Sequence, residues 1–225
     1  MTSGNGNGHR KRLPRAERER LIVEEAVRFF AEVGFEGQTR ALADRLGVTQ
    51  PLLYRYFADK DALIERVFDE VFLRRWRPEW EDLLRDRDRS LSDRLIDFYQ
   101  NYCQTIFTPE WIRIFMFAGL KGEIVNQHYF DIVFTNILKP FCIELRHDLG
   151  LPDIDQRPIA EAEVDLAWAL HGSISYIAMR KWIYKLPVPE EIDPLIAVSV
   201  TAFMQGSGVA LRQLFQQTPC TAAQA

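Results

Sequence analysis

The fold of this chain is decided by one stretch, QTRALADRLGVTQPLLYRYFADK, which spans residues 38–60. Leu42 and Leu46 are four residues apart, as on one face of a helix, and Gly47 is the residue type expected just past a helix end. Thr49 is suited to N-cap a second helix with Pro51 in its first turn, where a missing amide hydrogen is tolerated. Two short helices joined by a glycine turn form a helix-turn-helix, a motif whose second helix is used for the DNA major groove.

Length and composition limit the classes of protein to consider. The chain has 225 residues, of which 47% are hydrophobic, enough for a sizeable core in one large domain or in two smaller ones. We expect no membrane span, because the longest apolar candidate, residues 195–204, includes Ser199 and Thr201. Residues 1–12 lack the apolar region of a secretory signal, so a cytoplasmic location is expected.

Charge and cysteine content add two expectations. The formal net charge is −4, but residues 1–60 hold 11 Lys and Arg against 8 Asp and Glu. A basic end on an acidic body fits a chain in which one end meets phosphate. Cys103, Cys142 and Cys220 have no Cys-x-x-Cys spacing and are expected to be free thiols.

The rest of the chain divides at glycines, prolines and charged runs. The basic cluster His9-Arg10-Lys11-Arg12 belongs either to a solvated tail or to an arm that touches DNA. Helical spacing predicts a helix from Arg15 to Val33 and a connecting helix capped by Asp59. The expected parts are a disordered basic arm (1–14), a helix-turn-helix domain (15–58), a connecting helix (59–76), a helical C-terminal domain (77–217) and a tail (218–225).

The last two predicted helices, 158–184 and 189–215, are rich in small residues that let helices approach closely. The pair either packs only within its own domain or joins a copy of itself as an intermolecular four-helix bundle. The expected contacts of the second arrangement are Leu170, Ile174, Ile177, Val198, Phe203, Gly206 and Val209. No segment has a convincing strand pattern, so the predicted fold class is all-α.

With these features in place, the chain resembles the TetR family of bacterial transcription regulators. The resemblance is specific over about residues 15–71. It is densest in TRALA (39–43), LGV (46–48), QP (50–51), LY (53–54), YF (56–57) and KDAL (60–63). Beyond residue 75 only the architecture is similar. The resemblance implies an N-terminal three-helix DNA-binding domain and a C-terminal helical domain that binds a ligand and forms a homodimer.

The resemblance also implies which residues contact operator DNA. Glutamine can pair with adenine, arginine with guanine, and leucine or proline can touch a thymine methyl group, while a lysine near a helix start suits a phosphate. The core of the small domain would hold Leu42, Leu46, Leu53 and Phe57. The expected DNA-binding residues are Thr39, Arg40, Thr49, Gln50, Pro51, Leu52, Tyr54, Arg55, Tyr56 and Lys60.

Aromatic residues indicate a possible effector site. The 15 Phe and 7 Tyr favour a cavity for an apolar or aromatic small molecule, although core packing is the alternative for each ring. The expected ligand-binding residues are Phe98, Tyr102, Trp111, Phe115, Tyr129, Trp168 and His171. No two histidines have His-x-x-His spacing, so His128, His147 and His171 suggest polar contacts rather than a metal site, and no cofactor is expected.

The sequence therefore predicts a homodimeric repressor that a small effector releases from a pseudo-palindromic operator. No catalytic residues and no membrane association are expected. One alternative is a helical-bundle ligand carrier or enzyme with a vestigial DNA-binding domain. Another is a protein-interaction module whose last two helices bind a foreign partner.

Overall fold

The computed structural model of the protein describes residues 13–121 and 124–217. Every regular element in these ranges is helical, which confirms the all-α prediction. The chain divides into two compact units, the first ending at Val67 and the second beginning at Phe68. This division falls inside the expected connecting segment, residues 59–76. The basic cluster at residues 9–12 and the tail at 218–225 lie outside the described residues.

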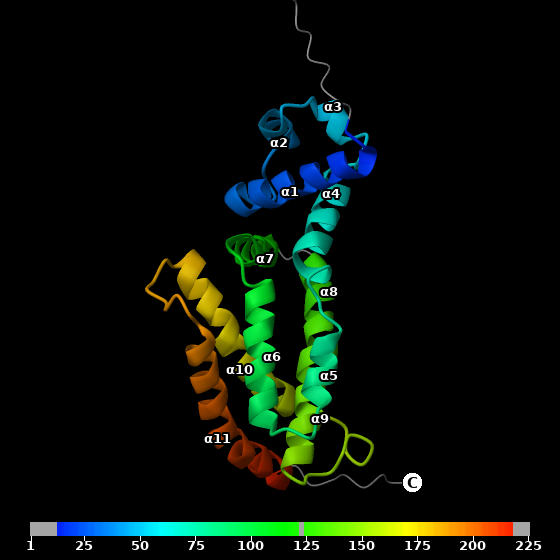
Figure 1. The fold of residues 1–225 in the computed structure, drawn as a ribbon. Coiled ribbons are helices and arrows are strands. Elements are labelled where there is room, and N and C mark those ends of the chain that lie inside the picture. Colours follow the sequence, from blue (N-terminus) through cyan, green and yellow to red (C-terminus); the bar gives the residue numbers. More distant parts are fainter. Residues whose placement is uncertain (1–12, 122–123, 218–225) are drawn as a thin grey trace, which may run out of the picture. The chain divides into compact units, whose positions relative to one another are not determined.

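The first unit is built on α1 (Arg15–Val33), α2 (Thr39–Leu46), α3 (Gln50–Leu53) and most of α4 (Lys60–Phe68), as Figure 1 shows. Its core is apolar, with Ile22, Phe30, Leu42 and Leu53 each no more than 2% exposed. Phe57 is also buried, as predicted, whereas Leu46 is only half-buried. The unit therefore forms a small core of its own beneath the helix-turn-helix.

The turn between α2 and α3 has the conformation that the sequence indicates. Gly47 is left-handed, with φ +63° and ψ +35°, and its N–H donates to the carbonyl of Asp44 (3.1 Å). The N–H of Val48 donates to the carbonyl of Ala43 (3.0 Å), which closes a Schellman-type helix end. Thr49 occupies the N-cap position of α3, but its side chain makes no capping hydrogen bond. The predicted Thr49 cap is therefore positional only.

The connecting helix begins where the sequence predicts and ends before its predicted last residue. Asp59 Oδ1 accepts a hydrogen bond from the Ala62 N–H (2.8 Å), so this carboxylate caps α4. The helix then continues into a π-helical turn, η1 (Asp69–Leu73), in which the Arg74 N–H reaches back to the Asp69 carbonyl (2.9 Å). Regular structure stops at Leu73 and does not reach Trp76, the predicted end.

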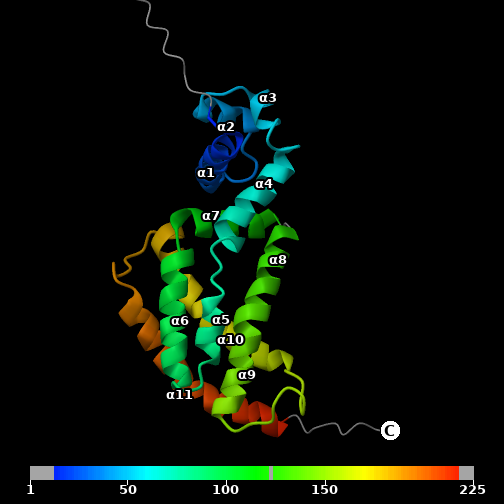
Figure 2. The same cartoon turned by 45° about the vertical axis from the view of Figure 1, so that its right-hand side comes forward.

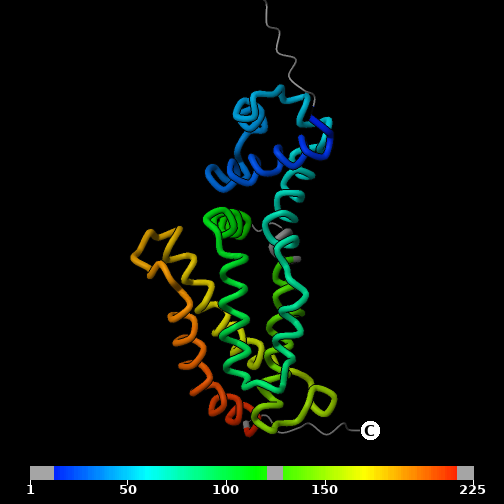
Figure 3. The backbone as a smooth tube through the Cα atoms, viewed as in Figure 1, coloured from blue at the N-terminus to red at the C-terminus, as the bar shows by residue number. Residues whose placement is uncertain are grey.

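The second unit is arranged around α6 (Leu91–Ile106), which packs against α5 (Glu79–Arg85), α9 (Lys139–Asp148) and α11 (Asp193–Gln217). Ser90 caps α6, since its Oγ accepts from the Asp93 N–H (3.1 Å). α7 (Pro109–Lys121) lies across one end of α6, as Figures 1 and 2 show. The tube in Figure 3 shows α10 (Glu161–Ala178) beside α11. η3 (Met179–Ile183) follows α10.

The helix that leads to Pro140 contains a second π-helical turn. α8 (Ile124–Val133) leads into the π-helical turn η2 (Phe134–Leu138), and α9 follows directly. Pro140 has no N–H to donate and its ring crowds the carbonyl four residues earlier, so a regular α-turn is unfavourable here. The extra residue in η2 relieves that conflict, a known role of π-bulges.

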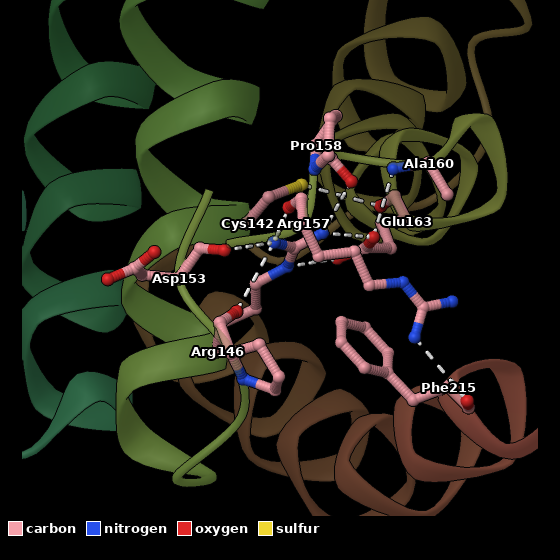
Figure 4. A network of polar contacts seen from close by, with 9 residues as sticks. Cys142, Arg146, Asp153, Arg157, Pro158, Ala160, Glu163 and Phe215 are labelled. Atoms are coloured by element: carbon pink, nitrogen blue, oxygen red, sulfur yellow. Dashed lines mark hydrogen bonds and ion pairs between the residues drawn. The ribbon is translucent and has the colours of Figure 1, made fainter. Parts of the chain in front are cut away.

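A buried arginine fixes the loop between α9 and α10 (Figure 4). Arg146 is 1% exposed, and its guanidinium donates two hydrogen bonds to the Glu163 carboxylate (2.6 and 2.7 Å). It also donates to the carbonyls of Arg157 (2.5 Å) and Pro158 (3.0 Å). This bidentate pair, saturated with further hydrogen bonds, ties the incoming loop to the start of α10.

Candidate nucleic-acid interface and small-molecule cavity

The expected DNA-binding residues lie on α2, on α3 and the residues around it, and at the start of α4, and half of them are exposed. Five are exposed: Arg40, Thr49, Pro51, Tyr54 and Arg55. Four are half-buried: Gln50, Leu52, Tyr56 and Lys60. The helix-turn-helix thus presents hydrogen-bonding and cationic side chains on one small domain.

Thr39 is the exception among these residues, and its direct contact with DNA stays a prediction. The residue is only 6% exposed. Its Oγ1 accepts a hydrogen bond from Gln50 Nε2 (2.8 Å) and shares another with the Tyr54 hydroxyl (2.9 Å). A hydroxyl has one proton and two acceptor lone pairs, and these two neighbours use two of its three hydrogen-bonding positions. Thr39 therefore orients Gln50 and Tyr54 across the turn.

The charges of this face are not neutralised within the protein. In the described part of the chain, Arg40, Arg55 and Lys60 have no ion pair with a carboxylate. By contrast, Arg45 pairs with Glu32 (2.5 Å) and Glu25 (3.7 Å). Cations left unpaired on one face give a surface suited to a polyanion.

A cavity of about 310 Å³ lies in the second unit, among α6, α8, η1 and η2. Its lining residues are mostly apolar and include no charged side chain: Phe72, Leu73, Trp76, Tyr102, Ile106, Tyr129, Ile132 and Asn136. An apolar pocket with few polar groups is the usual form of a small-molecule site. We call these eight residues the effector cavity.

Only two of the seven expected ligand-binding residues, Tyr102 and Tyr129, line the effector cavity. The other five lie in the aromatic cluster behind it: Phe98, Trp111, Phe115, Trp168 and His171. Phe98, for example, is fully buried and stacks on Tyr102 at 5.7 Å between ring centroids. Of the residues that sequence reasoning missed, Phe72 and Trp76 were assigned to the connecting helix, and Asn136 was a lone amide in an apolar stretch.

Two tyrosine hydroxyls form the polar spot of the cavity. The Tyr102 and Tyr129 hydroxyl oxygens are 2.7 Å apart and share a hydrogen bond. Burial raises the pKa of both phenols well above the ordinary value, so both hydroxyls stay protonated. One proton serves the pair, which leaves one O–H and the Asn136 amide to meet a polar group of a ligand.

Two further polar atoms lie buried in the aromatic cluster without a partner among the described residues. One is Nδ1 of His171, whose ring contacts Tyr99, Tyr102 and Trp168. The other is Nε1 of Trp111, whose ring stacks between Phe107 and Phe115. Burial lowers the pKa of His171 to about 4, so its imidazole is neutral at pH 7.

The described residues contain no group of three His, Cys, Asp or Glu that could hold a metal ion. Glu144 and His147 have Glu-x-x-His spacing, a pattern that the sequence analysis overlooked. In the structure Glu144 instead accepts hydrogen bonds from Arg87 (2.9 Å) and Arg94 (2.9 Å), and His147 is exposed. Cys103 and Cys142 are buried free thiols, as expected, while Cys220 lies outside the described residues.

Three of the expected dimer contacts are wrong. Leu170, Ile174 and Ile177 are at most 4% exposed and belong to the core of a single chain, because the buried side of α10 faces its own unit. The other four lie on α11: Val198 (65% exposed) and Val209 (61%), with Gly206 exposed and Phe203 half-buried. Exposed residues recur every three or four positions along α11, which leaves one side of this helix uncovered.

By length and composition alone, one helix in the described ranges passes the test for a membrane span. The segment Asp193–Gln216 has a mean hydropathy of 1.5 in its most apolar window, of which 22% is buried. Residues 195–204, the apolar run on which the expectation of no membrane span was based, form only part of this segment. Its exposed positions include Thr201, Gln205 and Arg212, which lipid disfavours and a protein interface accommodates.

Together these features define a class: a helix-turn-helix protein whose second, helical unit contains a mostly apolar cavity. Residues 22–67 match the family described as "Bacterial regulatory proteins, tetR family". The helix-turn-helix unit of the chain is therefore of this family's type.

Two curated relatives are tetracycline repressor proteins from Escherichia coli. The class A protein from transposon 1721 is 32% identical over 85 residues, which are 34% of this chain and 39% of the relative. The class C protein is 41% identical over 51 residues, or 22% of this chain and 23% of the relative. The match thus spans well under half the length of either repressor.

Solved structures extend the likeness of fold over most of the chain. A TetR-like transcriptional regulator from Rhodococcus sp. RHA1 has a TM-score of 0.58 and 21% identity, covering 88% of this chain and 99% of its own. A protein from Pseudomonas aeruginosa PAO1, described as a transcriptional regulator, has a TM-score of 0.67 and 19% identity, covering 91% and 96%. At these identities the comparison establishes the fold, which includes the helical second unit.

Proposed function

We propose that the protein is a cytoplasmic, homodimeric transcription repressor that a small uncharged effector releases from operator DNA. The observation that carries the proposal is the uncompensated positive charge of Arg40, Arg55 and Lys60 beside Gln50, on a helix-turn-helix of the tetR family. Gln50, Pro51, Leu52 and Arg55 read base edges, while Tyr54, Tyr56 and Lys60 hold the phosphate backbone.

Two copies are needed because one helix-turn-helix reads a half-site only. The uncovered side of α11, which carries Val198, Gly206 and Val209, is the surface for the second copy. Small residues there permit close approach of two helices, and the interspersed polar residues favour protein over lipid as the cover. A two-fold dimer places two recognition helices roughly 34 to 36 Å apart, one turn of DNA.

The effector cavity supplies the switch. Its lining is apolar and uncharged, and its polar groups are a tyrosine hydroxyl and an amide. The matching ligand is a neutral, mostly apolar or aromatic molecule with one or two hydrogen-bonding groups. Phe72 and Leu73 line the cavity on η1, which continues from α4 without a break in the helix. A ligand that changes the conformation of η1 can thus also move α4. A coupling free energy of about 1–3 kcal/mol between ligand binding and DNA binding is sufficient.

The DNA-binding part is tested with a pool of random-sequence duplexes, each about 40 base pairs long. The full chain is used to select the duplexes that it binds. We expect enrichment of a pseudo-palindrome with half-site centres about 10 base pairs apart. The Arg55→Ala protein should bind the enriched site more weakly and lose preference at one position of each half-site, by about 1–3 kcal/mol. A pool that shows no enrichment would contradict the proposal and favour the ligand-carrier alternative.

The effector part is tested by thermal shift with neutral planar compounds, using Trp76→Ala as the cavity variant and Leu120→Ala as a surface control. A binder at 100 times its Kd raises stability by about 3 kcal/mol. The same compound should lower operator affinity for the native chain and have no effect on Trp76→Ala. A compound that stabilises both proteins equally does not occupy this cavity.

A further inference from the structure

A second cavity, in the first unit, lies next to α3 and the residues that follow it, 50–57, which we call the recognition turn. It has a volume of about 390 Å³. Leu13, Arg15 and Arg18 line one side, from the start of α1 and the residues before it, and Leu52, Arg55 and Tyr56 line the other. The expected DNA contacts include the second group but no residue of α1.

Three guanidinium groups meet at this cavity without a carboxylate to balance them. In the described part of the chain, Arg15, Arg18 and Arg55 form no ion pair, although Glu17 and Glu19 are their neighbours on α1. Other arginines of the same unit, although not Arg40, are paired. Arg20 binds Glu24, and Arg28 lies 3.4 Å from Glu25.

One of these arginines, Arg15, is held in place by an aromatic ring of the cavity. The guanidinium carbon of Arg15 lies 5.7 Å from the centroid of the Tyr56 ring, within the range of a cation–π contact. Tyr56 belongs to the recognition turn, so this contact joins α1 to the residues that follow α3. Like charges gathered around one cavity repel each other, and an anion placed between them removes that repulsion.

We propose that this arginine pocket, formed by Arg15, Arg18, Arg55 and Tyr56, holds a backbone phosphate of the DNA beside the base pair that Arg55 reads. The inference rests on the proposed DNA binding and adds α1 to the interface. Guanidinium groups match phosphate oxygens with paired N–H donors, and phosphate contacts fix the register of a protein on the duplex. Arg15 and Arg18 thus contribute affinity, whereas Arg55 contributes sequence preference.

The test measures salt dependence of binding for Arg15→Ala, Arg18→Ala and the control Arg20→Ala. Arg20 lies on the same helix and its removal changes the net charge equally, but it does not line the pocket. Anisotropy titrations of the selected operator and of a scrambled duplex are made between about 50 and about 200 mM salt.

Each pocket variant should reduce the magnitude of the slope of log K against log salt by about 1, a weakening of about tenfold near 0.1 M salt. The loss should be equal on the two duplexes, so the ratio of operator to scrambled affinity stays unchanged. Arg55→Ala should lower that ratio. Arg20→Ala should leave the slope within error of the native chain.

The inference fails if Arg15→Ala and Arg18→Ala change the slope no more than Arg20→Ala does. It also fails if inorganic phosphate, at constant ionic strength, stabilises the native chain but not these variants while their DNA slopes remain native, since the pocket would then serve a free anion. In either case the native chain still binds the operator, so the proposed function stands. Absence of any salt-dependent complex with the native chain would refute the proposed function itself.

Discussion

At the scale of single residues, the hydroxyl of Thr39 connects two side chains that are proposed to meet DNA. It receives a hydrogen bond from Gln50 and shares another with Tyr54, and both bonds link α2 to the recognition turn. Thr39→Val keeps the shape but leaves the amide of Gln50 without this partner. We expect operator affinity to fall about tenfold, and affinity for scrambled DNA to change little, because Gln50 loses its fixed orientation.

Anisotropy titrations of both duplexes check this expectation, with Tyr54→Phe as the companion variant that keeps the Gln50–Thr39 bond. If Thr39→Val retained native preference for the operator, Thr39 would have no positioning role.

His171 gives a pH dependence with a definite sign. Its pKa is about 4 in the folded chain, against 6.5 for an ordinary solvent-exposed histidine, because burial disfavours the charged ring. The unfolded chain therefore binds more protons between these values, and stability rises with pH from about 4 to 6.5 and is flat above. The full difference is of order 3 kcal/mol.

Urea unfolding at pH 4.5 and pH 7, compared between the native chain and His171→Phe, measures this contribution. The native chain should lose more stability on acidification than the variant does. Equal losses in the two proteins would show that His171 is not the titrating group.

At the scale of elements, the start and end signals were readable from the sequence. α1 has the predicted bounds, Asp59 caps α4, and Gly47 ends α2 with a positive φ. Thr108 also caps α7 as its sequence suggests, since its Oγ1 accepts from the Trp111 N–H (3.1 Å). Such signals depend on neighbours within a few residues, and sequence states those neighbours directly.

The wide turns and the cavity could not be predicted in the same way. A π-turn inserts one residue without breaking apolar spacing, so η1 and η2 look like ordinary helix in the sequence. Phe98 and Tyr102 are both aromatic and four residues apart, yet only Tyr102 reaches the effector cavity. Which ring faces the cavity depends on how α6, α8 and η1 pack, and no local pattern contains that information.

Gly47 tests the turn between α2 and α3. An added Cβ would meet nothing within 4 Å, so Gly47→Ala disturbs only the backbone conformation. The left-handed backbone disfavours alanine by about 1–2 kcal/mol, and asparagine by less. Thermal denaturation should therefore rank the proteins as native, Gly47→Asn and Gly47→Ala in order of decreasing stability. An alanine variant as stable as the native chain would contradict the need for this conformation.

At the scale of the whole molecule, the uncovered side of α11 is the proposed surface for a second copy of the chain. Val209→Glu places a charge at the centre of the proposed interface, and Leu120→Glu changes an equally apolar residue that is 81% exposed on α7. We expect Val209→Glu to be monomeric at concentrations where the native chain and Leu120→Glu are dimers. Burying an unpaired charge in an interface is strongly unfavourable.

Light scattering gives the mass of each protein, and circular dichroism confirms that each is folded. Operator affinity should fall at least tenfold for Val209→Glu, because two linked half-sites are then bound separately. A dimeric Val209→Glu protein would place the interface elsewhere on the surface.

One titration measures whether a two-fold dimer of this protein binds DNA in a sequence-specific way. Anisotropy of the selected operator is compared with that of a scrambled duplex of equal length at physiological salt. We expect two chains per operator duplex and an affinity ratio of at least about a thousandfold. Equal affinity for the two duplexes, or saturation with a single chain, would contradict this expectation.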